Sequence, residues 1–174
     1  SFRRWCIVGH WPVTLYHPHV PSAAPLLAEG RHIASIDGGC SLKVDGQLNA
    51  LVLPERPGGA FSWFAYDGLP TAEALDPQAP SADSVNIRWG RNALEVLERG
   101  AELSLCRHLE TGRVLEVLTE YLYVDRGVTR CEDSTDYRLA VRPGDTLSVV
   151  RRISDRALVK KDGVTGWYFG RLAH

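Results

Sequence analysis

The apolar residues in the first third of the chain form short runs that end at glycine or proline. Runs of this kind, bounded by turn residues, are typical of β-strands rather than of helices. The run 3–8 ends at a Gly-His pair, and the four prolines within 12–30 argue against a long helix there. The pattern therefore predicts strands at 3–8 and 31–37 with a surface loop between them.

Two turn signals follow the second of these strands. An Asp-Gly pair at 45–46 separates the runs 40–44 and 47–53, and Asp-Gly is a strong signal for a two-residue hairpin turn. A Pro-Gly-Gly sequence at 57–59 then precedes the aromatic run 61–66. The sequence predicts a hairpin over 40–53, a turn, and one last strand.

The composition changes after residue 67. Residues 68–84 contain three prolines among alanine, aspartate and serine, which is the composition of a linker. We therefore divide the chain into a first unit at 1–67, a linker at 68–84 and a second unit at 85–174.

The second unit shows many short strand patterns separated by turn signals. The region 85–97 reads as a hairpin, although its second half would also suit a helix. Clearer strands are predicted at 113–124, 138–141, 146–153, 157–160 and 166–170. Short strands at such close intervals predict a small β-barrel, and the fold class of the whole chain is mainly β.

Charge and composition exclude several classes of partner. The chain has 174 residues, with 20 Lys and Arg against 21 Asp and Glu, so its formal net charge is −1. This balance argues against a nucleic acid or an anionic membrane as partner. The sequence shows neither a membrane span nor a signal peptide, and a cytoplasmic location is expected. The four cysteines form no C-x-x-C pair and are expected to be free, mostly buried thiols.

His10 is the first candidate for chemistry. It stands at the predicted end of a strand, after Gly9, which leaves room for another group to approach. A neutral imidazole suits zinc, iron or manganese as a ligand. The structural alternative is an ordinary histidine beside a turn. His17 and His19 would in principle complete a three-histidine site, although they lie in the proline-rich loop.

The motifs around His10 resemble those of a known family. Gly9-His10 is followed by Ile-Asp-Gly-Gly at 36–39 and by Gly-Gln-Leu-Asn-Ala-Leu at 46–51. This order resembles the C-terminal end of the bacterial calcineurin-like metallophosphoesterases, in their phosphoprotein phosphatase branch. Trp11 departs from the threonine usual in that branch. The first unit is therefore expected to supply the C-terminal strands of a β-sandwich that is α/β in the complete parent.

The resemblance implies a metal-dependent phosphoric-ester hydrolase, with protein phosphoserine or phosphothreonine among its candidate substrates. A pair of divalent ions, Mn, Fe or Zn, would hold a hydroxide that attacks phosphorus. His10 would be one ligand, Gly9 and Asp37 would lie beside the site, and Asp37 would be more structural than catalytic. The other ligands would come from outside this chain, which is expected to be part of a longer parent and inactive alone.

The end of the chain resembles a second family. The run 142–150, the Lys-Lys-Asp-Gly turn at 160–163 and Gly-Trp-Tyr at 166–168 resemble bacterial SH3-like domains. Trp167 and Tyr168 would then line a groove for a peptide partner. The structural alternative places Trp167 in the barrel core and leaves Tyr168 partly exposed. A non-catalytic binding module that recruits a peptide or protein is thus the alternative function.

One further cluster has acidic side chains. Glu132, Asp133 and Asp136 would suit a hard cation, but they lack the glycine and the spacing of a calcium loop. A solvated turn is the structural alternative for this segment.

Overall fold

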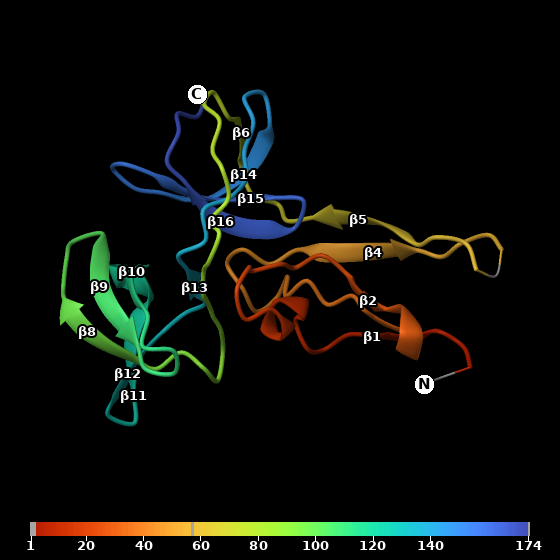
Figure 1. Cartoon of the computed structure of the whole chain (residues 1–174), viewed down its shortest axis with the longest axis horizontal. Helices are drawn as coiled ribbons and strands as arrows, with labels where there is room; N and C mark the ends of the chain where they lie inside the picture. The colour runs from red at the N-terminus through yellow and green to blue at the C-terminus, as the bar shows by residue number, and fades with distance from the viewer. Residues whose placement is uncertain (1–2, 57, 174) are drawn as a thin grey trace.

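The computed structural model describes residues 3–56 and 58–173 (Figure 1). Within these residues the chain forms sixteen strands and three short 3-10 helices, and it has no helix of seven residues or more. The prediction of a mainly β fold is confirmed. The strands form several small sheets rather than one large one.

The first unit is built on a three-stranded sheet with the order β1-β3-β2. The elements are β1 (Cys6–Val8), η1 (Val13–Tyr16), β2 (Leu26–Ala28), η2 (Glu29–Arg31) and β3 (Ile33–Ser35). β1 pairs parallel with β3, and β2 pairs antiparallel with β3. The strands predicted at 3–8 and 31–37 are therefore present but shorter. Because β1 and β3 run parallel, their carboxyl ends lie at the same edge of the sheet.

The hairpin predicted around 45–46 is wrong. Residues 40–46 form consecutive turns, and β4 (Leu48–Val52) pairs instead with β5 (Ser62–Tyr66). The reason is a close backbone approach, since a Cβ on Gly46 would lie 2.2 Å from the carbonyl oxygen of Gly39. Gly46 thus serves packing rather than a type I′ turn. The turn that joins β4 to β5 includes Gly58 at φ +82°, as expected there, while Pro57 lies outside the described residues.

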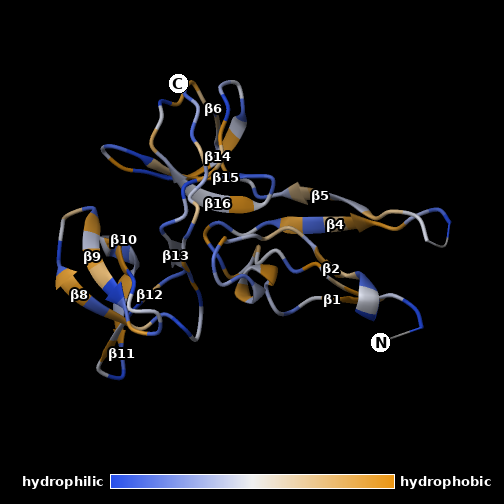
Figure 2. Ribbon diagram, viewed as in Figure 1, coloured by the Kyte–Doolittle hydropathy of each residue, from blue (hydrophilic) through white to orange (hydrophobic). Residues whose placement is uncertain are grey.

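The hairpin of β4 and β5 has one apolar face toward solvent. Leu48, Ala50 and Val52 on β4 lie on the same face as Phe64 and Tyr66 on β5, because their positions are directly paired. The side chains of Phe64 and Tyr66 are 69% and 73% exposed. Figure 2 shows the hydrophobic positions along this hairpin, which extends away from the rest of the chain.

The segment expected to be a linker has structure of its own. β6 (Thr71–Glu73) pairs with β14 (Thr146–Arg152), and β15 (Ala157–Lys161) and β16 (Val164–Tyr168) complete a sheet of order β16-β15-β14-β6. Ala74 and Gln78 form further bridges, to Leu172 and Val141. Residues 71–78 therefore belong to the C-terminal sheet, whose strands at 146–153 and 157–160 were predicted correctly.

Residues 85–136 form a separate group of strands. Its elements are β7 (Asn86–Ile87), β8 (Leu94–Glu98), β9 (Leu103–His108), β10 (Val114–Leu118), η3 (Thr119–Tyr121), β11 (Leu122–Asp125), β12 (Val128–Cys131) and β13 (Ser134–Thr135). They pair as the sheet β10-β9-β8, the hairpin β11-β12 and the pair β13-β7. The run 93–97, which would have suited a helix, contains most of β8, but the hairpin predicted over 85–97 is wrong because β7 pairs with β13 and β8 pairs with β9.

The single small barrel predicted for 85–174 does not form, because the described strands show no barrel closure. Two of the three clusters of buried residues in the described part of the chain explain this. One centres on Leu147, Val159 and Tyr168 in the C-terminal sheet, and the other on Ile87 and Cys106 in the region 85–136. Each group of strands has its own core, and a third cluster of Leu118, Leu158 and Trp167 packs the two groups together.

The loop of the first unit connects these groups (Figure 1). The N–H of Asn86 donates to the Pro18 carbonyl over 2.9 Å. The N–H of Thr165 on β16 donates to the Pro21 carbonyl over 3.1 Å. The loop 12–30 is therefore not a free surface excursion, because it is hydrogen-bonded to both later groups.

Candidate functional site

His10 and Asp37, which were predicted to lie at or beside a metal site, follow shortly after the ends of β1 and β3. The Ile36 N–H donates to the carbonyl of Val8 over 3.0 Å, which keeps the two strands together to their last residues. The Asp37 carboxylate accepts a 2.8 Å hydrogen bond from the Gly39 N–H, and its carbonyl accepts one from the Val13 N–H. Asp37 thus holds the turn after β3, which agrees with the structural role expected of it.

His10 projects from this edge in an unusual backbone conformation. Its φ is +73°, in the left-handed region that costs a non-glycine residue of order 1–3 kcal/mol. The residue is exposed, and a Cβ on Gly9 beside it would meet nothing within 4 Å. The imidazole is therefore accessible to groups from outside the chain.

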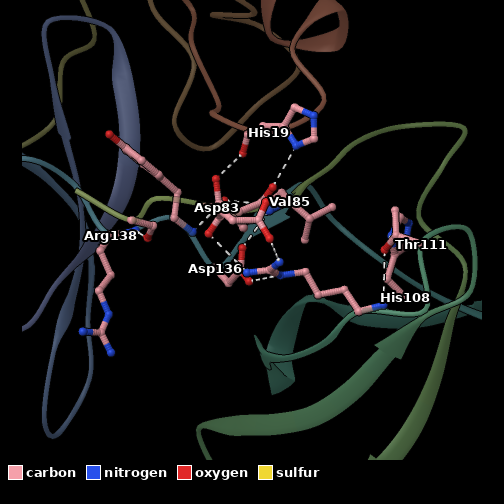
Figure 3. Close-up of polar contacts among 12 residues, drawn as sticks. His19, Asp83, Val85, His108, Thr111, Asp136 and Arg138 are labelled. Carbon is pink, nitrogen blue, oxygen red and sulfur yellow. Dashed lines mark hydrogen bonds and ion pairs between the residues drawn. The ribbon is translucent and has the colours of Figure 1, made fainter.

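The described residues do not form a complete metal site by themselves. Over residues 3–56 and 58–173, no three His, Cys, Asp or Glu side chains are grouped so that they would hold an ion. His19 is held elsewhere, because its Nδ1 lies 3.0 Å from the Ser84 carbonyl oxygen and the Ser84 hydroxyl donates to the His19 carbonyl (Figure 3). The three-histidine site is therefore not formed.

The acidic cluster is divided between two basic partners. Asp133 forms an ion pair with Lys43, whereas Asp136 pairs with Arg113 and accepts a 2.8 Å hydrogen bond from the Val85 N–H (Figure 3). Carboxylates that are committed to separate cations do not form a site for a hard cation. The segment is neither a cation site nor a freely solvated turn.

Trp167 and Tyr168 are too buried to form the exposed peptide-binding surface predicted for them. Their side chains are 5% and 0% exposed, so the partial exposure expected for Tyr168 is wrong. The Trp167 Nε1–H donates to the Thr135 carbonyl over 2.9 Å. The Tyr168 hydroxyl donates to the carbonyl of Asp76 over 2.7 Å and accepts from its N–H over 3.0 Å. Tyr168 is buried because the segment 68–84, which was expected to be a linker, packs against it at Asp76.

A cleft of about 440 Å³ lies where the three parts of the chain meet. Its walls are mostly apolar and aromatic. The first unit contributes His10, Trp11 and 42–45, the region 85–136 contributes Trp89, Tyr121, Tyr123 and 131–135, and the C-terminal sheet contributes Val150, Leu158, Thr165 and Trp167. Clefts of this volume are the usual size of binding sites for small ligands or single side chains.

A polar network fixes one wall of this cleft. Lys43 pairs with Asp45 over 3.2 Å and with Asp133, so it joins the first unit to the region 85–136. The Thr165 hydroxyl donates to the Asp45 carboxylate over 2.7 Å, and the Lys160 ammonium donates to the Asp45 carbonyl over 2.8 Å. Asp45 therefore also connects the first unit to the C-terminal sheet.

These contacts favour the charged forms of Lys43 and Asp45, whereas burial lowers the pKa of Lys160. Burial alone lowers the pKa of Lys43, but Asp45 and Asp133 outweigh it and raise the pKa above its ordinary value. Burial alone raises the pKa of Asp45, but Lys43, Thr165 and Lys160 outweigh it and hold the pKa low. At neutral pH Lys43 and Asp45 are therefore held as a charged pair.

Cys131, the cysteine in the cleft lining, has a thiol of low reactivity. Burial raises the pKa of Cys131 to about 12, so its thiol stays protonated and is a poor nucleophile at neutral pH. All four cysteines are free, with Cys106 and Cys131 buried and Cys40 exposed. Nucleophilic catalysis by Cys131 is therefore not supported.

Sequence reasoning missed Lys43, Asp45 and Trp89 as site residues. Lys43 and Asp133 are 90 positions apart, and no spacing in the sequence indicates their contact. Trp11 and Trp89 meet edge to face with ring centroids 5.9 Å apart, another contact between distant segments. The one signal in the sequence was Trp11, which stands where the resembled phosphatase branch usually has threonine. Trp11 lies in the cleft wall beside His10.

Acid is expected to destabilise the fold. Hydrogen bonds from Arg171 lower the pKa of Asp76 to about 2, and Lys161 lowers the pKa of Asp145, as the network does for Asp45. Such groups stabilise the fold above their unfolded pKa of about 4, and this contribution is lost as the pH falls through the folded pKa. The urea midpoint, followed by tryptophan fluorescence, should fall between about pH 6 and about pH 3. An unchanged or higher midpoint at the lower pH would contradict this.

Comparison with known proteins finds no relative, since no protein family, curated protein or solved structure matches this chain. Among residues 3–56 and 58–173, none of the helices has the length and apolar character needed to cross a bilayer.

Proposed function

We propose that this chain contributes His10 as one metal ligand of a metal-dependent phosphoric-ester hydrolase. The observation that carries the proposal is the parallel pairing of β1 and β3, which presents an accessible imidazole at the same edge as Asp37. The left-handed backbone at His10 adds support, because such conformations cluster at functional sites. The substrates would be phosphomonoesters, with protein phosphoserine and phosphothreonine as candidates, and the setting would be cytoplasmic.

The proposal requires that the remaining ligands come from residues outside this chain. When bound in such a centre, a pair of Mn, Fe or Zn ions supplies a hydroxide nucleophile and neutralises phosphoryl oxygens. The role of this chain is to hold one of the ions through the imidazole of His10. The Asp37 carbonyl accepts a hydrogen bond from the Val13 N–H, which ties the turn after β3 to the segment that follows His10, and Asp37 would act by positioning that segment.

Exposed apolar surfaces on the first unit are consistent with this requirement. β1 is the edge strand of its sheet, and its Ile7 and Val8 side chains are exposed. The apolar face of β4 and β5 is exposed as well, through residues such as Phe64 and Tyr66. Exposed strand edges and apolar faces are places where further polypeptide packs. The rest of the hydrolase would cover these two surfaces.

The test replaces His10 with alanine in a longer protein that carries the other ligands. With added manganese, the parent should hydrolyse para-nitrophenyl phosphate, and His10→Ala should lower kcat/KM by at least about 100-fold. The matched control is His17→Ala, which removes an imidazole that is half-buried in the loop and should change the rate less than about twofold. No turnover by the parent, or an unchanged rate for His10→Ala, would refute the proposal.

A non-catalytic binding module is the second candidate function. It no longer rests on Trp167 and Tyr168, which are buried. The cleft is the observation that favours it, because Trp11 and Trp89 remain 44% and 66% exposed at its wall. Aromatic side chains that stay exposed beside a cleft are typical of recognition surfaces.

A further inference from the structure

The cleft presents aromatic rings from distant parts of the chain. Trp11 and Trp89 pack edge to face, and Tyr121 and Tyr123 contribute to the same lining. Trp11 and Trp89 are substantially exposed, so parts of their ring surfaces are open to a ligand. Aromatic rings grouped in this way attract an organic cation, because the faces of the rings carry partial negative charge.

The charged side chains of the lining point to the same class of ligand. The lining holds Asp45, Asp133, Glu116 and Glu132 but only one lysine, Lys43. Lys43 is shared by two of these carboxylates, and Glu116 is paired with an arginine outside the lining. Within the described part of the chain, the exposed carboxylate of Glu132 forms no ion pair. With Lys160 at the Asp45 carbonyl also counted, the excess of negative charge in the cleft comes from Glu132.

We infer that this cleft binds an organic ammonium ion with an apolar body. The aromatic rings at the wall would contact its charged end, the carboxylates would provide charge complementarity, and the apolar floor would take its body. In the absence of a bound metal ion, an organic anion of the same size would be repelled. This inference deepens the binding-module function and does not depend on the hydrolase proposal, since neither a metal nor a phosphate group takes part.

The experiment is a titration of the 174-residue chain in the absence of metal, followed by proton–nitrogen correlation spectra. The probe is benzyltrimethylammonium, and the matched control is benzenesulfonate, an anion of similar size. The cation should cause saturable shifts of the indole N–H signals of Trp11 and Trp89, assigned through single substitutions. Benzenesulfonate should bind at least about fivefold more weakly.

Two variants test the contacts separately. Trp89→Leu should weaken binding of the cation about fivefold, and Glu132→Gln about threefold. Their controls are Tyr66→Leu and Glu98→Gln, which change exposed residues outside the cleft lining and should leave the affinity unchanged. The substituted residues are exposed, and the dispersion of the spectra checks that each variant folds.

The inference is overturned if benzyltrimethylammonium causes no saturable shift, if benzenesulfonate binds as well, or if both cleft variants bind like the original chain. None of these outcomes bears on metal-dependent hydrolysis. Conversely, an inactive parent would refute the hydrolase proposal and leave the cleft unaffected.

Discussion

Replacing Leu147 with alanine is expected to lower the free energy of unfolding by about 3–4 kcal/mol. Leu147 on β14 is fully buried in the cluster that holds the C-terminal sheet together, beside Val159 and Tyr168. The substitution removes apolar contacts and leaves a cavity that the surrounding strands fill only partly. Urea unfolding, followed by tryptophan fluorescence, measures the loss.

The matched control is Leu42→Ala, because Leu42 is 75% exposed at the mouth of the cleft. That change should cost less than about 0.5 kcal/mol. A loss below about 1 kcal/mol for Leu147→Ala would mean that Leu147 is not in a well-packed core, and the described C-terminal sheet would then be wrong.

Replacing Asp45 with alanine is expected to cost about 3 kcal/mol. The substitution would leave Lys43 with one carboxylate partner and would remove the acceptor of the Thr165 hydroxyl. Breaking a largely buried ion pair on one side is costly, because the remaining charge stays in a poorly solvated place. The loss should appear as a lower urea midpoint at neutral pH.

Glu98→Ala serves as the control for Asp45, since Glu98 is exposed on β8 and lies outside the network. Its midpoint should be unchanged. A second variant, Asp45→Asn, keeps an acceptor for Thr165 and should lose less stability than Asp45→Ala. Equal effects of Asp45→Ala and Glu98→Ala would show that the network does not hold the three parts of the chain together.

Local patterns in the sequence predicted many of the strands, although the single strand expected at 113–124 is β10 and β11 separated by η3, and no strand forms at 138–141. The runs that contain β1, β3 and β14 are apolar stretches bounded by turn residues, and such signals depend only on neighbours in the chain. The prediction failed at 45–46, where an Asp-Gly pair does not form a hairpin turn. There, contacts of Asp45 with the distant Thr165 and the close packing of Gly46 outweigh the local turn preference.

The sheet boundaries could not be predicted from composition. Residues 71–73 lie in a proline-containing segment, yet they form β6 at the edge of the C-terminal sheet, where prolines in the flanking loops are tolerated. Two separate cores likewise leave no signal in the spacing of short strands. The candidate sites divide in the same way, because His10 and Asp37 are proposed from local motifs, whereas the contacts of Lys43 and Trp89 depend on tertiary structure.

The measurement that tests the central claim most directly is anomalous diffraction from crystals of the longer protein grown with manganese. The proposed function predicts a metal ion within about 2.0–2.2 Å of an imidazole nitrogen of His10, with the other ligands coming from residues outside this chain. A metal centre whose ions have no contact with His10, or crystals that bind no ion beside β1 and β3, would contradict it.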